Sequence, residues 1–246
     1  MLTPLPFFQN NVNGTVSILK VMKDEGVTRL VFSSTATVYG NRASSPLLIE
    51  TLPRPPKNPY GQSKLMAEMI LEACVKPNNL QSVALRYFNA SGADAKSRTG
   101  ERHSPETHLV PLVIETALGK RAQINIYGDD YDTPDGTGVR DYIHVEDLAD
   151  GHVLSLKSLL ETDKSHTVNL GTGEGSSVLD VLAAYSEACG QDLAHTIAPR
   201  RDGDVAVLTA RPEQAKAQLG FEAKRSLADM CKSSWEWVSG QRRNTH

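Results

Sequence analysis

The chain has 246 residues, a formal net charge of −3, 39% hydrophobic and 22% charged residues, and no long run of like charge. This balance is that of an ordinary soluble globular protein, and it argues against a nucleic-acid-binding or membrane-surface protein. Cys74, Cys189 and Cys231 are odd in number and lack a C-x-x-C spacing, so a reducing compartment is favoured over a disulfide framework. The opening MLTPLPFFQN lacks the basic start and apolar stretch of a signal peptide, and a cytoplasmic protein is expected.

Helices and strands alternate in the first part of the chain. Apolar residues recur at helical spacing over 10–26 and again over 59–75, and Gly26 is placed to end the first helix. Short apolar runs over 27–34 and 82–90 follow these helices and read as buried strands. The order helix–strand–helix–strand is typical of an α/β fold with a parallel sheet covered by helices.

From about residue 93 the chain has longer loops and shorter elements. Six segments are expected, namely a helix over 108–120, a strand over 124–128, a turn-rich loop over 129–140, a strand and helix over 141–160, a strand, turn and helix over 165–189, and a closing helix over 226–240. Since ligands bind beyond the carboxyl ends of parallel strands, the polar residues after strands 27–34 and 82–90 mark the expected site.

The stretch NPYGQSK, residues 58–64, places Tyr60 and Lys64 one turn apart at the start of a helix opened by Pro59. A nearby ammonium lowers the pKa of a tyrosine, so this pair is suited to exchange a proton with a substrate hydroxyl. The alternative is an exposed helix start with an incidental lysine.

Other patterns suggest chemistry but do not fit it fully. GTGEG at 171–175 follows a strand, but Ser176 breaks the G-x-G-x-x-G pattern, and a tight strand–helix turn is predicted in place of a phosphate loop. The seven histidines form neither H-E-x-x-H nor a Cys–His cluster, so no metal site is expected.

Five stretches, VFSSTATVYG, NPYGQSK, LRYFNASGA, DGTGVRDYIHVEDLADGH and PRRDGD, resemble in that order the UDP-glucose 4-epimerases of the extended short-chain dehydrogenase/reductase family. The resemblance covers residues 10–237. It implies interconversion of UDP-galactose and UDP-glucose by transient oxidation at C4 with bound NAD. Nucleotide-sugar dehydratases carry an Asp–Glu pair where this chain has Ala36 and Thr37, which disfavours loss of water.

The resemblance implies three sets of site residues. The catalytic set contains Tyr60 as base, Lys64, which lowers its pKa, and Thr35, whose hydroxyl bridges the tyrosine and the sugar O4. The cofactor-binding set is Asn10, Ser33, Lys64 and Tyr87. The substrate-binding set is Asn89, His108, Leu109, Asn125, Tyr127, Arg140, Val178, Arg201, Asp204 and Leu208. The two arginines suit a diphosphate, because guanidinium groups pair with phosphate oxygens.

One part of the family pattern has no counterpart in this sequence, namely the opening strand, Gly-rich turn and helix that hold the NAD pyrophosphate. The expected fold is therefore a doubly wound, Rossmann-like parallel sheet, N-terminally truncated, with a smaller C-terminal α/β domain for the substrate. The expected division is 1–92 for the NAD-binding part, onto which segments near 142–190 pack back, and 93–246 mainly for the UDP-sugar.

The truncation leads to further expectations and alternatives. The chain alone is expected to bind NAD weakly and to be poorly soluble or to associate, since a parallel sheet is normally covered on both faces. A full-length form is expected to be a homodimer through helices near 8–25 and 59–75. The alternatives are a non-catalytic UDP-sugar-binding remnant and another nucleotide-sugar epimerase or dehydratase of the same family.

Overall fold

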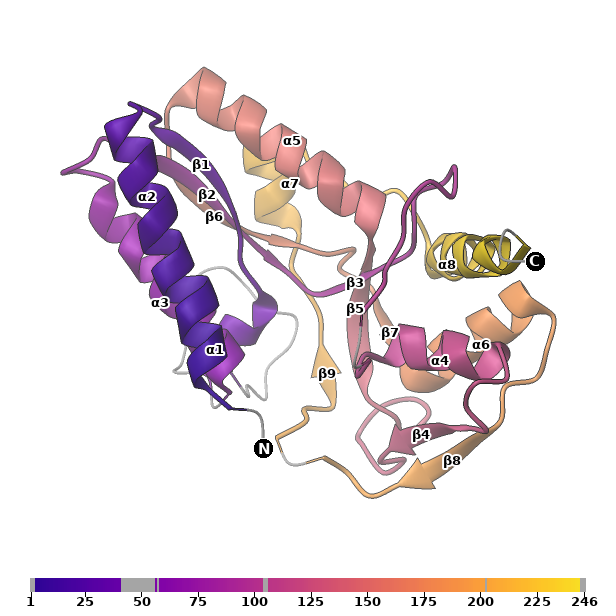
Figure 1. The fold of residues 1–246 in the computed structure, drawn as a ribbon. Helices are drawn as coiled ribbons and strands as arrows, with labels where there is room; N and C mark the ends of the chain where they lie inside the picture. The colour runs from indigo at the N-terminus through magenta and orange to yellow at the C-terminus, as the bar shows by residue number, and fades with distance from the viewer. Residues whose placement is uncertain (1–2, 41–55, 57, 104–105, 202, 244–246) are drawn as a thin grey trace.

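The computed structural model describes residues 3–40, 56, 58–103, 106–201 and 203–243 (Figure 1). Its helices are α1 Leu5–Phe7, the π-helix η1 Phe8–Asn13, α2 Gly14–Asp24, the 3₁₀ helix η2 Ala36–Tyr39, α3 Pro59–Cys74, α4 Leu109–Ala117, α5 Val145–Thr162, α6 Val178–Cys189, α7 Glu213–Leu219 and α8 Leu227–Arg243. Its strands are β1 Arg29–Ser33, β2 Gln81–Tyr87, β3 Asn89–Ser91, β4 Ile124–Tyr127, β5 Val139–His144, β6 His166–Leu170, β7 Gly175–Ser177, β8 His195–Ala198 and β9 Val207–Leu208. The predicted α/β class is confirmed.

The helix predicted over 59–75 is confirmed as α3, and its start has a local cause. The Asn58 side chain accepts a hydrogen bond of 2.7 Å from the Gly61 amide, and Pro59 occupies the first helical position. An Asn cap followed by Pro satisfies a free amide and presets the backbone angle, so the sequence alone determines where this helix begins.

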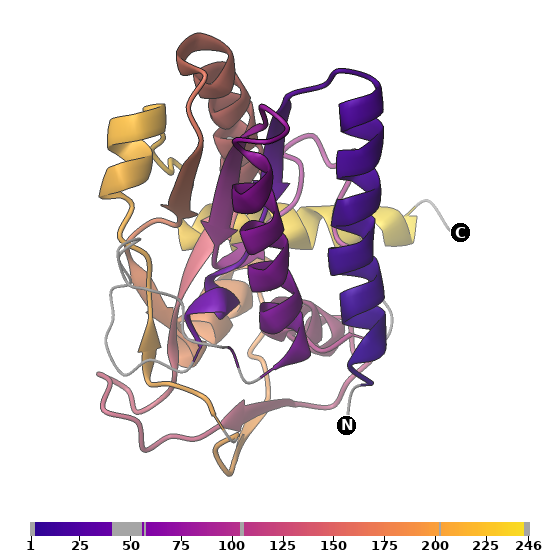
Figure 2. The same cartoon turned by 90° about the vertical axis from the view of Figure 1, so that its left-hand side faces the viewer.

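The strands β1, β2 and β6 form a parallel sheet in the order β1-β2-β6. Along β1, side chains alternate between the two faces, as the strand geometry requires. Leu30 and Phe32 pack with the cluster of α2 and α3, and Val31 packs with the cluster that includes Leu159 of α5. Helices therefore cover both faces, with α2 and α3 on one and α5 on the other (Figures 1 and 2).

The strand β5 organises the second part of the molecule. It pairs with β3 and β9 in parallel and with β7 in antiparallel orientation, and β4 pairs separately with β8. A second core of buried side chains, among them Val113, Ile126, Val181 and Met230, lies between α4, α6 and α8 and the strands β4 and β5. Strand β6 belongs to the first sheet, and helices α5 and α7 pack with that sheet. The assignment of residues 1–92 and 93–246 to two domains stays a prediction.

Two expectations from composition can be compared with the described residues. Cys74, Cys189 and Cys231 each carry a free thiol. Among the described helices, none combines the length and the apolar character that crossing a membrane would need.

Candidate functional site

Tyr60 and Lys64 lie in the first turns of α3, facing the carboxyl end of β1. The Lys64 ammonium donates a hydrogen bond of 3.0 Å to the Ser33 carbonyl oxygen, and its Nζ lies 6.0 Å from the centre of the Tyr60 ring. The Thr35 side chain is hydrogen-bonded to Tyr60. The structure thus brings Tyr60, Lys64 and Thr35 together, as the sequence predicted.

The electrostatics of Tyr60 differ from the expectation that its pKa is lowered. Burial raises the pKa of Tyr60 and is the largest influence, while the hydrogen bond with Thr35 acts in the opposite direction. Burial also lowers the pKa of Lys64. The i, i+4 spacing correctly places the two side chains on one face of α3. Burial of the phenol nevertheless raises the pKa of Tyr60, where that spacing suggested a lowered pKa.

Ser33 and Tyr87, at the ends of β1 and β2, are connected by His152, a residue that the sequence patterns missed. The Ser33 hydroxyl lies 2.9 Å from His152 Nε2, and His152 Nδ1 lies 2.8 Å from the Leu148 carbonyl oxygen. Because a carbonyl oxygen only accepts, Nδ1 of His152 donates to Leu148, and in the neutral ring this leaves Nε2 to accept from the Ser33 hydroxyl. The Tyr87 and His152 rings are 6.4 Å apart, so His152 supports both predicted cofactor residues.

Asn10 lies in η1 and is exposed. Its neighbour Asn11 donates a hydrogen bond of 2.9 Å from Nδ2 to Ser63 of α3. Asn11 therefore makes a hydrogen bond between η1 and α3 near the candidate site.

A buried ion pair holds the segment that carries Thr35. Arg86 donates to Glu68 at 3.0 and 2.6 Å, and Glu68 in turn accepts from the Ser34 hydroxyl. Arg86 also donates to the Tyr39 hydroxyl at 3.1 Å, which donates to Asn169 at 2.8 Å. These bonds anchor both ends of the turn 34–39, so Thr35 is presented to Tyr60 from a fixed backbone.

A cavity of about 290 Å³ opens between α4, β4 and the segment before β9. All predicted substrate residues except Leu208 line it, namely Asn89, His108, Leu109, Asn125, Tyr127, Arg140, Val178, Arg201 and Asp204. Arg121 and Tyr131 line it as well and were not predicted. Three arginines therefore converge on one cavity, which suits an anionic ligand.

Two of the arginines have different environments. Arg140 donates to the carbonyls of Val139 and Val205 at 2.9 Å each, and its Nη2 lies 3.9 Å from Asp204. Arg201 is exposed and stacks on Tyr127, with 3.7 Å between the guanidinium carbon and the ring centre. Hydrogen bonds from Arg201 and Asn125 lower the pKa of Tyr127. Arg140 is thus held by backbone carbonyls, whereas the exposed Arg201 is accessible to a ligand.

Leu208 connects the cavity to the Tyr60 region. It pairs with Arg140 in the register of β5 and β9, and its side chain packs against the buried cluster of Ala36, Val38 and Tyr39. Arg140 therefore lies on the cavity side, and Leu208 lies beside the turn that carries Thr35.

The GTGEG segment forms a tight turn, as predicted. The buried Asp141 carboxylate accepts from the Thr172 amide and hydroxyl at 2.9 Å each, from the Gly173 amide at 3.0 Å and from the Ala210 amide at 3.1 Å. A Cβ on Gly171 would lie 2.5 Å from Asp141 Oδ2, so a residue without a side chain is needed there. Because Asp141 already occupies these amides, the turn does not present them to a phosphate.

Comparison with known proteins gives consistent results. Residues 1–171 match the NAD dependent epimerase/dehydratase family. The UDP-glucose 4-epimerase of Bacillus subtilis (strain 168) is 47% identical over 238 residues, which are 96% of this chain and 70% of that protein.

Solved structures are similar as well. The UDP-glucose-4-epimerase from Stenotrophomonas maltophila, with bound NAD and formylated UDP-arabinopyranose, has a TM-score of 0.94 and 42% identity, covering 98% of this chain and 72% of that one. The UDP-glucose 4-epimerase from Bifidobacterium longum, in complex with NAD+ and UDP, has a TM-score of 0.88 and 43% identity, covering 97% and 72%.

Proposed function

This chain belongs to the NAD dependent epimerase/dehydratase family, and we propose that it acts as a UDP-glucose 4-epimerase, interconverting UDP-galactose and UDP-glucose. The observation that carries the proposal is the continuity between two groups of residues. The arginine-lined cavity suits a UDP moiety, and Leu208 joins its wall to the turn that presents Thr35 to Tyr60. A sugar attached to a diphosphate in the cavity would extend towards Tyr60.

The roles of the chain's own residues follow from this placement. Tyr60 takes the proton from the sugar 4-hydroxyl and later returns it, and Thr35 bridges the phenol and the sugar oxygen. Arg201 and Arg140 bind the diphosphate, with Arg140 held in place by backbone carbonyls and Asp204. Binding at the diphosphate leaves the sugar ring free to turn, so that both faces of C4 can be presented.

The residues at the carboxyl ends of β1 and β2 fit the nicotinamide ribose of NAD. The Lys64 ammonium has donors in addition to the one given to the Ser33 carbonyl, and the Ser33 hydroxyl and Tyr87 lie alongside it on the neighbouring strands. When bound, NAD supplies the oxidant for C4 and adds a positive charge that favours the Tyr60 phenolate. Lys64 would bind the ribose hydroxyls and His152 would hold Ser33 in position.

The experiment is an assay of UDP-galactose turnover at saturating NAD+, because weak NAD binding is expected of this chain, and it is paired with calorimetric binding of UDP. Tyr60→Phe is expected to abolish turnover and to leave UDP affinity within about twofold, because Tyr60 does not line the UDP cavity. Lys64→Met is expected to shift the pH–rate profile upward.

Three outcomes would contradict the proposal, and the first two point to the alternatives. UDP binding without turnover by the wild type would indicate a UDP-sugar-binding remnant. Formation of a 4-keto-6-deoxy sugar would indicate a dehydratase, and wild-type turnover by Tyr60→Phe would reject the role of Tyr60.

A homodimer and a cytoplasmic location belong to the same proposal. Helices α2 and α3 lie side by side (Figure 2) and carry exposed apolar residues, with Ile18 55%, Val21 61% and Met69 61% exposed. Such a surface suits pairing with a second copy. Val21→Lys is expected to lower the mass measured by light scattering, whereas Leu160→Lys, also 61% exposed but on α5, should not. Free thiols at all three cysteines are consistent with the cytoplasm.

A further inference from the structure

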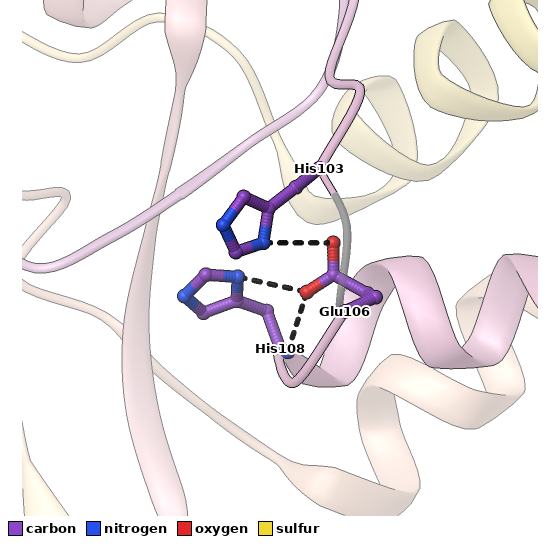
Figure 3. A group of neighbouring side chains, drawn as sticks. All are labelled: His103, Glu106 and His108. Carbon is purple, nitrogen blue, oxygen red and sulfur yellow. Dashed lines mark hydrogen bonds and ion pairs between the residues drawn. The ribbon is translucent and has the colours of Figure 1, made fainter. Parts of the chain in front are cut away.

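Three side chains of metal-binding types converge on the loop before α4. His103, Glu106 and His108 point towards one another (Figure 3), and their candidate ligand atoms all lie within 4.8 Å of one another. The Nδ1 atom of His108 lies 2.9 Å from Glu106 Oε1, and that of His103 lies 3.8 Å from Glu106 Oε2. The spacing H-x-x-E-x-H is not one of the patterns considered in the sequence, so the site was missed there.

These distances suit a tetrahedral metal ion. Nitrogen and oxygen ligands at ~2.0–2.1 Å from zinc lie ~3.3–3.5 Å from one another, and the observed separations bracket that range. A further carboxylate is close, since Glu101 Oε1 lies 3.8 Å from His108 Nδ1. Two imidazoles favour zinc and similar transition ions over magnesium, which prefers oxygen ligands.

The central carboxylate is already fixed in place. Glu106 Oε1 accepts hydrogen bonds of 2.7 Å from the backbone amides of Thr107 and His108, and the Glu106 side chain is only 7% exposed. The Oε2 atom of Glu106 lies on the side of His103 (Figure 3).

We propose that His103, Glu106 and His108 bind a divalent transition-metal ion of the zinc type, with Glu101 as an additional ligand. His108 also lines the substrate cavity, so the ion would lie at the rim of that cavity. The proposal goes beyond the epimerase function and does not depend on it.

The test is calorimetric titration of the chelator-treated chain with Zn2+, with Mg2+ as the comparison ion. One Zn2+ per chain is expected, with no saturable Mg2+ binding. His103→Gln should weaken Zn2+ binding at least ~10-fold, and because the His103 side chain is 52% exposed, the variant should keep the fold. The matched control is His195→Gln, an exposed histidine on β8 that should bind Zn2+ like the wild type.

Co2+ absorption distinguishes this site from one formed by the three cysteines. Nitrogen and oxygen ligands give tetrahedral Co2+ bands without the thiolate charge-transfer band. Thiolate bands, no Zn2+ binding, an unchanged affinity in His103→Gln, or an equal loss in His195→Gln would each overturn the proposal.

Discussion

Replacing Asp141 would test how much the buried carboxylate between β5 and the turn after β6 contributes to the free energy of unfolding. Its carboxylate is buried and accepts from three backbone amides and one hydroxyl. In Asp141→Ala the buried Ala210 amide loses its acceptor, at ~1–3 kcal/mol, and the more exposed amides of Thr172 and Gly173 lose ~0.5–1.5 kcal/mol each on returning to water. Burial raises the pKa of Asp141, so removing the charge recovers part of this loss. We expect the free energy of unfolding to fall by about 2–4 kcal/mol.

Asp141→Asn separates the loss of charge from the loss of shape. In either orientation the new amide group faces backbone N–H donors, that of Thr172 in one case and those of Gly173 and Ala210 in the other. The Thr172 hydroxyl can rotate to accept, so the first orientation is preferred and the expected loss is about 1–2 kcal/mol.

The assay is urea unfolding followed by tryptophan fluorescence, with Asp192→Ala, an exposed carboxylate, as the control. The turn held by Asp141 leads through β7 to Val178 in the cavity wall, so UDP affinity of the folded variant should fall as well. A loss of less than 1 kcal/mol in Asp141→Ala would refute the argument from stranded amides. Unchanged UDP affinity would refute the link to the cavity.

Three further predictions concern the cavity, the sugar and pH. Arg201→Ala should raise the Kd for UDP about 10- to 100-fold, since a hydrogen bond to a charged group is worth ~1.5–3 kcal/mol. An increase in Kd of less than about threefold, measured by calorimetry, would contradict the role of Arg201. Leu208→Tyr should selectively lower kcat/KM for UDP-N-acetylgalactosamine relative to UDP-galactose. The bulkier side chain lies against the Ala36 cluster, and fitting an acetyl group as well costs ~1–3 kcal/mol of overpacking. Equal losses for both substrates, or no turnover of the acetylated substrate by the wild type, would reject this prediction. Burial lowers the pKa of His144 in the folded chain. As pH falls through ~6.5, the unfolded chain therefore takes up a proton that the folded chain does not, and the free energy of unfolding should decrease. His144→Asn, which keeps a helix-capping side chain, should reduce this acid sensitivity in thermal melts, whereas His195→Asn should not.

Local patterns in the sequence determined the start of α3, the buried strand β1 and the tight turn after β6. Asn58 and Pro59 act within one helical turn, and Ser176 breaks the dinucleotide-binding pattern within the turn itself. The resemblance to a family then placed nine substrate residues that line one cavity. These features depend on neighbours in the chain or on an ordered set of motifs, and both can be seen in a sequence.

Tertiary structure alone decided which distant groups meet and how they titrate. Ser33 and His152 are 119 positions apart, and the amide of Ala210 reaches Asp141 across 69 positions, so no local spacing predicts either contact. The direction of the Tyr60 pKa likewise depends on burial, which is a property of everything packed around the phenol. The spacing of Tyr60 and Lys64 determines that they share a helix face, whereas desolvation and hydrogen bonding by residues elsewhere in the chain determine the direction of the pKa shift of Tyr60.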